Sequence, residues 1–146
     1  MVKELDKPHI SGKIKLVRFH LFGERGITMA TVLLVDDNED VRKTTASIFL
    51  LSHTVIQAVD GQDGMEKIGS NADTIDIVVT DFSMPRLNGL ELASWVKKNH
   101  PEIPVILISS EERSNFAPAD AFVLKDFSDD NKGLYLLQDL IATLLP

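Results

Sequence analysis

The stretch TVLLVDD, residues 31–37, decides the fold, because a short apolar run ends abruptly in two carboxylates. Two later runs follow the same plan: residues 75–80 lead into Asp81, and residues 121–124 lead into Lys125. If each run is a buried parallel strand, these charged residues meet at the carboxyl edge of one sheet. Ligands gather at that edge in open α/β folds.

Three carboxylates at one edge, Asp36, Asp37 and Asp81, would repel one another unless a cation lay among them. Carboxylate oxygens are ligands that suit Mg²⁺. The pattern therefore predicts a metal-assisted phosphoryl site in which one carboxylate is free to act as a nucleophile.

Composition limits the class of protein. A chain of 146 residues with 44% hydrophobic and 25% charged residues is the size of one globular domain. No apolar stretch approaches the length of a membrane span, and the net charge of −7 argues against non-specific nucleic-acid binding. The absence of cysteine excludes disulfides and thiolate metal sites, and fits a cytoplasmic location.

Charge divides the chain into two parts. Residues 1–28 hold six basic and three acidic residues, a net of +3, which leaves −10 for residues 29–146 of a chain whose total is −7. A shift of this kind is typical of a domain boundary. We expect residues 1–28 to be a poorly ordered extension or a non-native start; a basic arm and an extra edge strand over 13–22 are alternatives.

From residue 31 onward, apolar runs alternate with helical patterns, which predicts a parallel sheet with helices on both faces. The strands are expected at 31–35, 53–59, 75–81, 105–108 and 121–124, and the helices at 38–51, 61–70, 90–99 and 129–145. Only 16 positions separate Ser109 from Lys125, and Pro118 lies among them, so any fourth helix over 110–117 must be short or irregular.

Residues 29–146 resemble a response-regulator receiver domain, the phosphoaccepting module of two-component signalling. The features that carry the resemblance are Asp36-Asp37, Asp81, Met84-Pro85 with Gly89, Ser109 and Lys125, in that order. The resemblance implies a flavodoxin-like, doubly wound five-stranded parallel sheet with strand order 2-1-3-4-5, here with a shortened fourth helix. The face formed by that helix, strand five and the last helix, which receivers use for output, would then be atypical.

The resemblance also implies a division of labour among the acidic residues. Asp81 would be the phosphoacceptor and would also bind Mg²⁺. Asp37 would bind the metal directly, Asp36 directly or through water, and Ser83 through its backbone carbonyl. Taken alone, each strand-end aspartate could equally cap a helix or lie in a solvated loop.

Three further residues would complete the site by the same resemblance. Lys125 would bind the phosphoryl oxygens, Ser109 would donate a hydroxyl hydrogen bond, and Ser109 with Phe122 would form a conformational switch. The alternatives are a surface lysine, a turn-capping serine and a core-packing aromatic. One departure stands out: Asp126 replaces a proline whose preceding peptide is cis in the family. A cis bond without proline costs about 3 kcal/mol, so a trans Lys125-Asp126 bond is expected, and Asp126 could compete for Lys125.

The favoured interpretation is a receiver that accepts a phosphoryl group from a sensor histidine kinase or a phosphotransfer protein. It would act in trans on a downstream protein, and would not itself be an enzyme. The alternative is a phosphorylation-independent interaction module with the same fold. A phosphatase with an aspartyl nucleophile is disfavoured, because such enzymes space their acidic pair as Asp-x-Asp. The kinase, the target, the aspartyl-phosphate lifetime and the oligomeric state are not encoded in any recognisable pattern.

Overall fold

A five-stranded parallel sheet forms the centre of the molecule in a computed structural model that describes residues 29–125 and 132–145. The strands are β1 (Thr31–Val35), β2 (Thr54–Ala58), β3 (Ile77–Asp81), β4 (Val105–Ser109) and β5 (Ala121–Leu124). Their order across the sheet is β2-β1-β3-β4-β5, which confirms the predicted fold and strand order. The predictions for residues 1–28 and for Asp126 lie outside the described residues.

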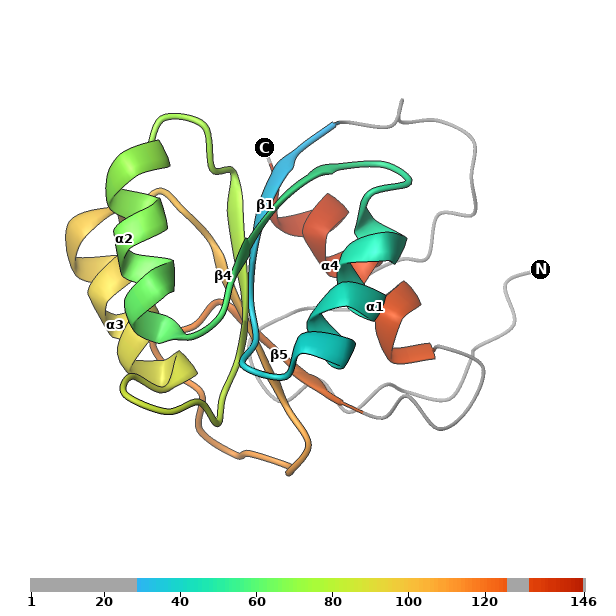
Figure 1. Cartoon of the computed structure of the whole chain (residues 1–146). Helices are drawn as coiled ribbons and strands as arrows, with labels where there is room; N and C mark the ends of the chain where they lie inside the picture. The colour runs from blue at the N-terminus through green and yellow to red at the C-terminus, as the bar shows by residue number, and fades with distance from the viewer. Residues whose placement is uncertain (1–28, 126–131, 146) are drawn as a thin grey trace.

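Four helices cover the two faces of the sheet: α1 (Glu39–Phe49), α2 (Gly61–Asn71), α3 (Gly89–Asn99) and α4 (Lys132–Leu144). Figure 1 shows α2 and α3 on one face, with α1 and α4 on the other. The first three helices begin at side-chain caps that satisfy free backbone N–H groups: Asn38, Asp60 and Asn88. Within the described ranges, no helix has the length and hydropathy that crossing a bilayer requires.

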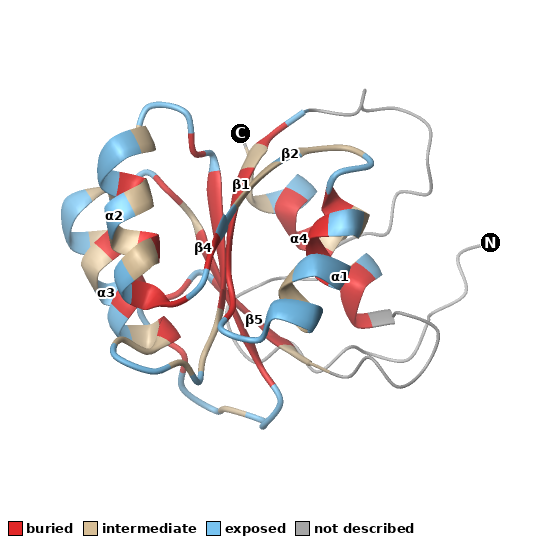
Figure 2. Ribbon diagram, viewed as in Figure 1, coloured by how far each residue is buried: buried red, intermediate tan, exposed pale blue. Residues whose placement is uncertain are grey.

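Alternation along the strands divides the core between the two faces. Leu33 and Val35 of β1 pack with the residues under α2 and α3, whereas Val32 and Leu34 pack with those under α1 and α4. Figure 2 shows the buried residues concentrated in the sheet and on the helix faces turned toward it. Burial on both sides explains why the central strands β1, β3 and β4 are nearly continuous apolar runs, whereas the edge strand β2 is partly exposed.

The connection between β4 and β5 was predicted to hold a short or irregular helix, but the structure shows no helix there. Residues 110–120 are all described, and they form bends and turns with no helix. Pro118 disfavours a helix, and the Asn115 side chain accepts a hydrogen bond from the Ala117 N–H at 3.1 Å, which favours a local turn. Phe116 and Ala119 of this loop are buried, and the Phe116 ring stacks on Phe122 at 5.8 Å between centroids. The loop thus supplies the apolar cover that a helix would otherwise provide.

Three strands differ from the expected bounds: β2 is one residue shorter at each end, β4 extends to Ser109, and β3 begins two residues late. β3 begins at Ile77 rather than at residue 75. The Ile75 N–H donates to the Asn71 carbonyl of the preceding helical turn, and the Asp76 side chain accepts from the Thr31 N–H at 2.8 Å. Both contacts hold these two residues in the turn ahead of the strand.

Candidate functional site

The carboxyl ends of the strands bring four polar side chains to one edge of the sheet. Asp81 and Ser109 are the last residues of β3 and β4, and Asp36 and Lys125 directly follow β1 and β5. Parallel pairing continues to the last residues of neighbouring strands, so these ends are aligned. The structure therefore brings together the residues that the sequence pattern placed at this edge.

The three carboxylates form a compact cluster. Asp36, Asp37 and Asp81 each offer a carboxylate oxygen, and these oxygens lie within 4.8 Å of one another. Lys125 Nζ lies 2.9 Å from Asp36 Oδ2 and 3.6 Å from Asp81 Oδ1. Asp36 is buried, Asp81 is half-buried and Asp37 is exposed, so the cluster is open to solvent on the Asp37 side.

Backbone contacts fix the orientation of Asp36. Its Oδ1 accepts the Asn38 N–H at 2.9 Å, its backbone carbonyl accepts Arg42 Nη1 at 2.8 Å, and its own N–H donates to the Ala58 carbonyl. With Lys125 on the other carboxylate oxygen, both oxygens of this buried group are partnered. Asp36 is thus held rigidly at the base of the cluster.

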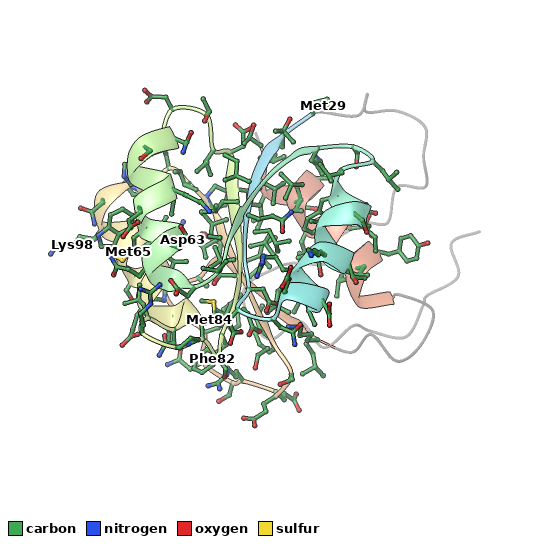
Figure 3. The ribbon with its side chains drawn as sticks, in the orientation of Figure 1. Met29, Asp63, Met65, Phe82, Met84 and Lys98 are labelled. Atoms are coloured by element: carbon green, nitrogen blue, oxygen red, sulfur yellow. The ribbon has the colours of Figure 1, made fainter. Side chains whose placement is uncertain are left out.

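Gly89 holds the backbone of the β3 end in place. Its N–H donates to the Phe82 carbonyl at 2.8 Å, and an added Cβ would overlap the Asp81 carbonyl oxygen and come within 2.8 Å of Leu107 Cδ1. Figure 3 labels Phe82 and Met84 on the loop that leads from β3 toward this helix start. The family motif includes Gly89, but sequence reasoning did not assign it this close approach.

Burial raises the pKa of Asp81 above its ordinary value, and the neighbouring charges of Asp36 and Asp37 raise it further. Lys125 opposes this shift through its positive charge. Burial is the largest cause of the raised pKa. Because three carboxylates face a single ammonium, the cluster is short of positive charge.

We expect Asp81→Asn to stabilise the metal-free protein near neutral pH. Because burial raises the pKa of Asp81 in the folded protein above its ordinary value, the contribution of this group to stability is full at low pH and is lost as pH rises through the folded pKa. Asparagine removes that loss, for a gain of up to about 1 kcal/mol. Urea unfolding of both proteins in a chelator, between about pH 4 and pH 7, checks this. A stability difference that does not grow with pH would contradict it.

Ser109 and Phe122, the predicted switch pair, are both buried. Ser109 Oγ accepts the Glu111 N–H at 3.1 Å, and its carbonyl accepts the Lys125 N–H at 2.6 Å. The hydroxyl thus makes the turn-capping contact that the sequence left open as an alternative. Ser83, the predicted carbonyl ligand, lies exposed two residues beyond Asp81.

Two arginine contacts at this edge have no signature in the sequence. Arg86, at a positive φ of 66°, pairs with Asp60 and so joins the loop after β3 to the start of α2. Burial alone would raise the pKa of Asp60, but the Asp63 N–H and the Arg86 guanidinium together lower it. Arg113 stacks on Phe82, with Cζ 3.2 Å from the ring centroid. Both contacts join residues more than 25 positions apart, which spacing arguments cannot detect.

A sequence profile of the response regulator receiver domain matches residues 32–132. This span runs from β1 to the first residue of α4 and contains the acidic cluster and Lys125. The chain belongs to the response-regulator receiver family.

Related proteins of different lengths contain a segment similar to this chain. The gliding motility regulatory protein of Myxococcus xanthus is 38% identical over 103 residues, which cover 64% of this chain and 13% of that protein. Chemotaxis protein CheY1 of Helicobacter pylori strain J99 is 36% identical over 84 residues, or 55% of this chain and 67% of CheY1. The receiver thus spans only a small fraction of the Myxococcus relative.

Solved structures show the same fold. CheY of Borrelia burgdorferi, in a CheX-CheY-BeF3-Mg+2 complex, superposes with a TM-score of 0.70 at 25% identity, over 80% of this chain and 90% of that one.

Proposed function

We propose that this receiver accepts a phosphoryl group on Asp81 and passes the signal on by protein–protein interaction. One observation carries the proposal: Lys125 Nζ lies within 3.6 Å of Asp81 and 2.9 Å of Asp36, beside three carboxylate oxygens that lie within 4.8 Å of one another. A nucleophilic carboxylate with a fixed cation beside it is what phosphoryl transfer to a side chain requires.

The donor set fits Mg²⁺, because it consists of hard carboxylate oxygens close enough to share one small cation. Asp36, Asp37 and Asp81 would hold the ion together with the backbone carbonyl of Ser83. Bound there, Mg²⁺ neutralises negative charge on the transferring phosphoryl group. The Borrelia CheY complex, which contains BeF3 and Mg+2, supports this choice of metal.

The residues of the chain supply the remaining chemistry. An Asp81 carboxylate oxygen attacks the phosphorus of a phosphohistidine, forming an O–P bond as the P–N bond breaks. The electron pair of the P–N bond stays on the imidazole nitrogen, which takes a proton from solvent. Lys125 binds the phosphoryl oxygens, and Ser109 donates its hydroxyl to them once it releases the Glu111 N–H. Phe122 would respond to that movement of Ser109, as the second member of the switch.

The partners follow from this chemistry. A sensor histidine kinase or a phosphotransfer protein would provide the phosphohistidine, and a downstream protein would bind the phosphorylated receiver. Asp81 would be consumed and regenerated as an acceptor, so the receiver is not an enzyme with a substrate of its own. We place it in the cytoplasm, with no nucleic-acid or membrane partner; the CheX-CheY complex supports a protein as the partner.

Intact mass spectrometry tests the proposal. Incubation of the full chain with Mg²⁺ and acetyl phosphate should add one phosphoryl group, and either Asp81→Asn or a chelator should abolish the addition. Asp73→Asn is a matched control, because Asp73 is an exposed carboxylate in the turn before β3, at the opposite edge of the sheet. An unmodified wild-type protein, or equal labelling of Asp81→Asn, would refute the assignment of Asp81.

The absence of a helix over residues 110–120 favours a second candidate, an interaction module that works without phosphorylation. The complete acidic cluster with Lys125 argues against it, since an unused switch does not need these residues. Partner binding that is tight in the unmodified protein and unchanged by Asp81→Asn would support this second candidate.

A further inference from the structure

Arg113 is a cation at the edge of the phosphoacceptor site to which the proposed chemistry gives no role. It lies in the β4–β5 loop, and its Cζ is 3.2 Å from the centroid of the Phe82 ring. Phe82 directly follows Asp81, so the guanidinium rests on the residue next to the phosphoacceptor. No carboxylate among the described residues pairs with Arg113, and its buried Nε has no hydrogen-bond partner there. Buried guanidinium N–H groups are nearly always partnered, so this donor is poised for an acceptor that arrives later.

The charges of the site indicate which acceptor that would be. The formal charges of the three carboxylates, Lys125 and one divalent cation sum to zero. Phosphorylation replaces one carboxylate charge with a phosphoryl charge of about −1.5 to −2, so the site becomes negative by up to about one charge. Lys125 is already shared between Asp36 at 2.9 Å and Asp81 at 3.6 Å. The added negative charge therefore lacks a dedicated cation.

The loop allows Arg113 to move while its ends stay in place. Ser109 is buried at the end of β4, four residues before Arg113, and Phe116 is buried against Phe122, three residues after it. Residues 110–115 between these two anchors are in bends or have no regular secondary structure, so there is no helix to disrupt. A change of side-chain rotamer and of this short segment would suffice to turn the guanidinium from the Phe82 ring toward the phosphoryl oxygens.

We propose that Arg113 is a second phosphoryl-binding cation, held on Phe82 until Asp81 is modified. This proposal rests on the proposed phosphorylation of Asp81. A planar guanidinium can donate two parallel hydrogen bonds to two phosphoryl oxygens, which a lysine cannot do. The movement would draw residues 110–115 over the site, and so couple the modified aspartate to the surface of the loop.

The test uses BeF3⁻, which stands in for a phosphoryl group on a carboxylate, with Mg²⁺ and the full chain. Arg113→Ala and Arg113→Gln should each weaken BeF3⁻ binding by about tenfold, the effect of losing a charge-assisted hydrogen bond. The BeF3⁻ affinity of Arg113→Lys should lie between that of these two variants and that of wild type. Mg²⁺ affinity without BeF3⁻ should be unchanged. Lys98→Ala, which removes an exposed positive charge on α3, controls for net charge and should leave BeF3⁻ binding unchanged.

A purely structural Arg113 gives a different pattern. If the guanidinium only covers Phe82, Phe82→Leu and Arg113→Gln should lower the unfolding temperature alike, and neither should change BeF3⁻ affinity; that result would overturn the proposal. If it binds the phosphoryl group, the Arg113 Nε–H resonance should shift when BeF3⁻ is added to wild type, and Phe82→Leu should retain BeF3⁻ binding. A wild-type protein that neither binds BeF3⁻ nor accepts a phosphoryl group would instead refute phosphorylation of Asp81 itself. Normal wild-type phosphorylation with unchanged Arg113 variants refutes only the role of Arg113.

Discussion

Replacement of Gly89 by alanine is expected to remove phosphorylation of Asp81 and to lower the free energy of unfolding by about 3 kcal/mol. The added Cβ would overlap the Asp81 carbonyl oxygen, and the carbonyl carbon lies only 3.0 Å away. Both are backbone atoms at the end of a buried strand, so neither can move without moving the carboxylate. A small displacement of a nucleophile is enough to lose most of its reactivity.

Gly69→Ala is the matched control for this substitution. Gly69 lies in α2 with no atom within 4 Å of an added Cβ, so alanine should stabilise the helix by up to about 1 kcal/mol. Its phosphorylation by acetyl phosphate should match wild type. Thermal unfolding and intact mass measure both effects. If Gly89→Ala proved as stable and as readily phosphorylated as Gly69→Ala, the close approach of Gly89 to Asp81 would not be needed for stability or phosphorylation.

Lys125→Met should also destabilise the metal-free protein by about 3 kcal/mol and prevent phosphorylation. The side chains of Lys125 and Asp36 are only 14% and 7% exposed, so removal of the ammonium leaves a buried carboxylate without its counter-ion. Asp81 then adds repulsion, because its own ion pair with Lys125 is lost as well. Saturating Mg²⁺ should restore part of the stability, since it binds the same carboxylates.

A double variant separates the two roles of Lys125. Asp36→Asn with Lys125→Met removes the uncompensated charge, so most of the lost stability should return, whereas phosphorylation should not. Lys43→Met is the control lysine: its pair with Glu39 is 66% and 65% exposed, and its loss should change stability by less than about 0.5 kcal/mol. Chemical denaturation and mass spectrometry give the two readouts. Full phosphorylation of Lys125→Met would show that Lys125 is not the phosphoryl-binding cation.

The sequence predicted most of the sheet because its central strands are buried on both faces. Residues 32–35 and 121–124 are apolar and are followed by charged residues, so the ends of these strands were visible. Parallel topology then required Asp36 and Lys125 to meet at one edge. The roles of these residues in phosphoryl transfer stay predictions. What the pattern could not show is distance: only the structure places Lys125 nearer to Asp36 than to Asp81.

Contacts between loops could not be predicted, because they depend on how segments from different strands pack. Nothing in the spacing of Gly89 indicates that it touches the Asp81 carbonyl, and nothing near Arg113 indicates that it stacks on Phe82. The same holds for Gly61, where an added Cβ would lie 2.5 Å from the Leu87 carbonyl oxygen. For Gly61 and Arg113, the deciding neighbour lies more than 25 positions away in the sequence.

The loop between β4 and β5 changes the way in which a signal would leave this domain. A helix at that place could travel as a rigid lever, but residues 110–120 contain none, and burial of Phe116 and Ala119 anchors them. Modification of Asp81 would therefore be expressed in the number of conformations that this segment samples, and a partner that requires the ordered form would bind more tightly. Hydrogen exchange over these residues would report this ordering directly.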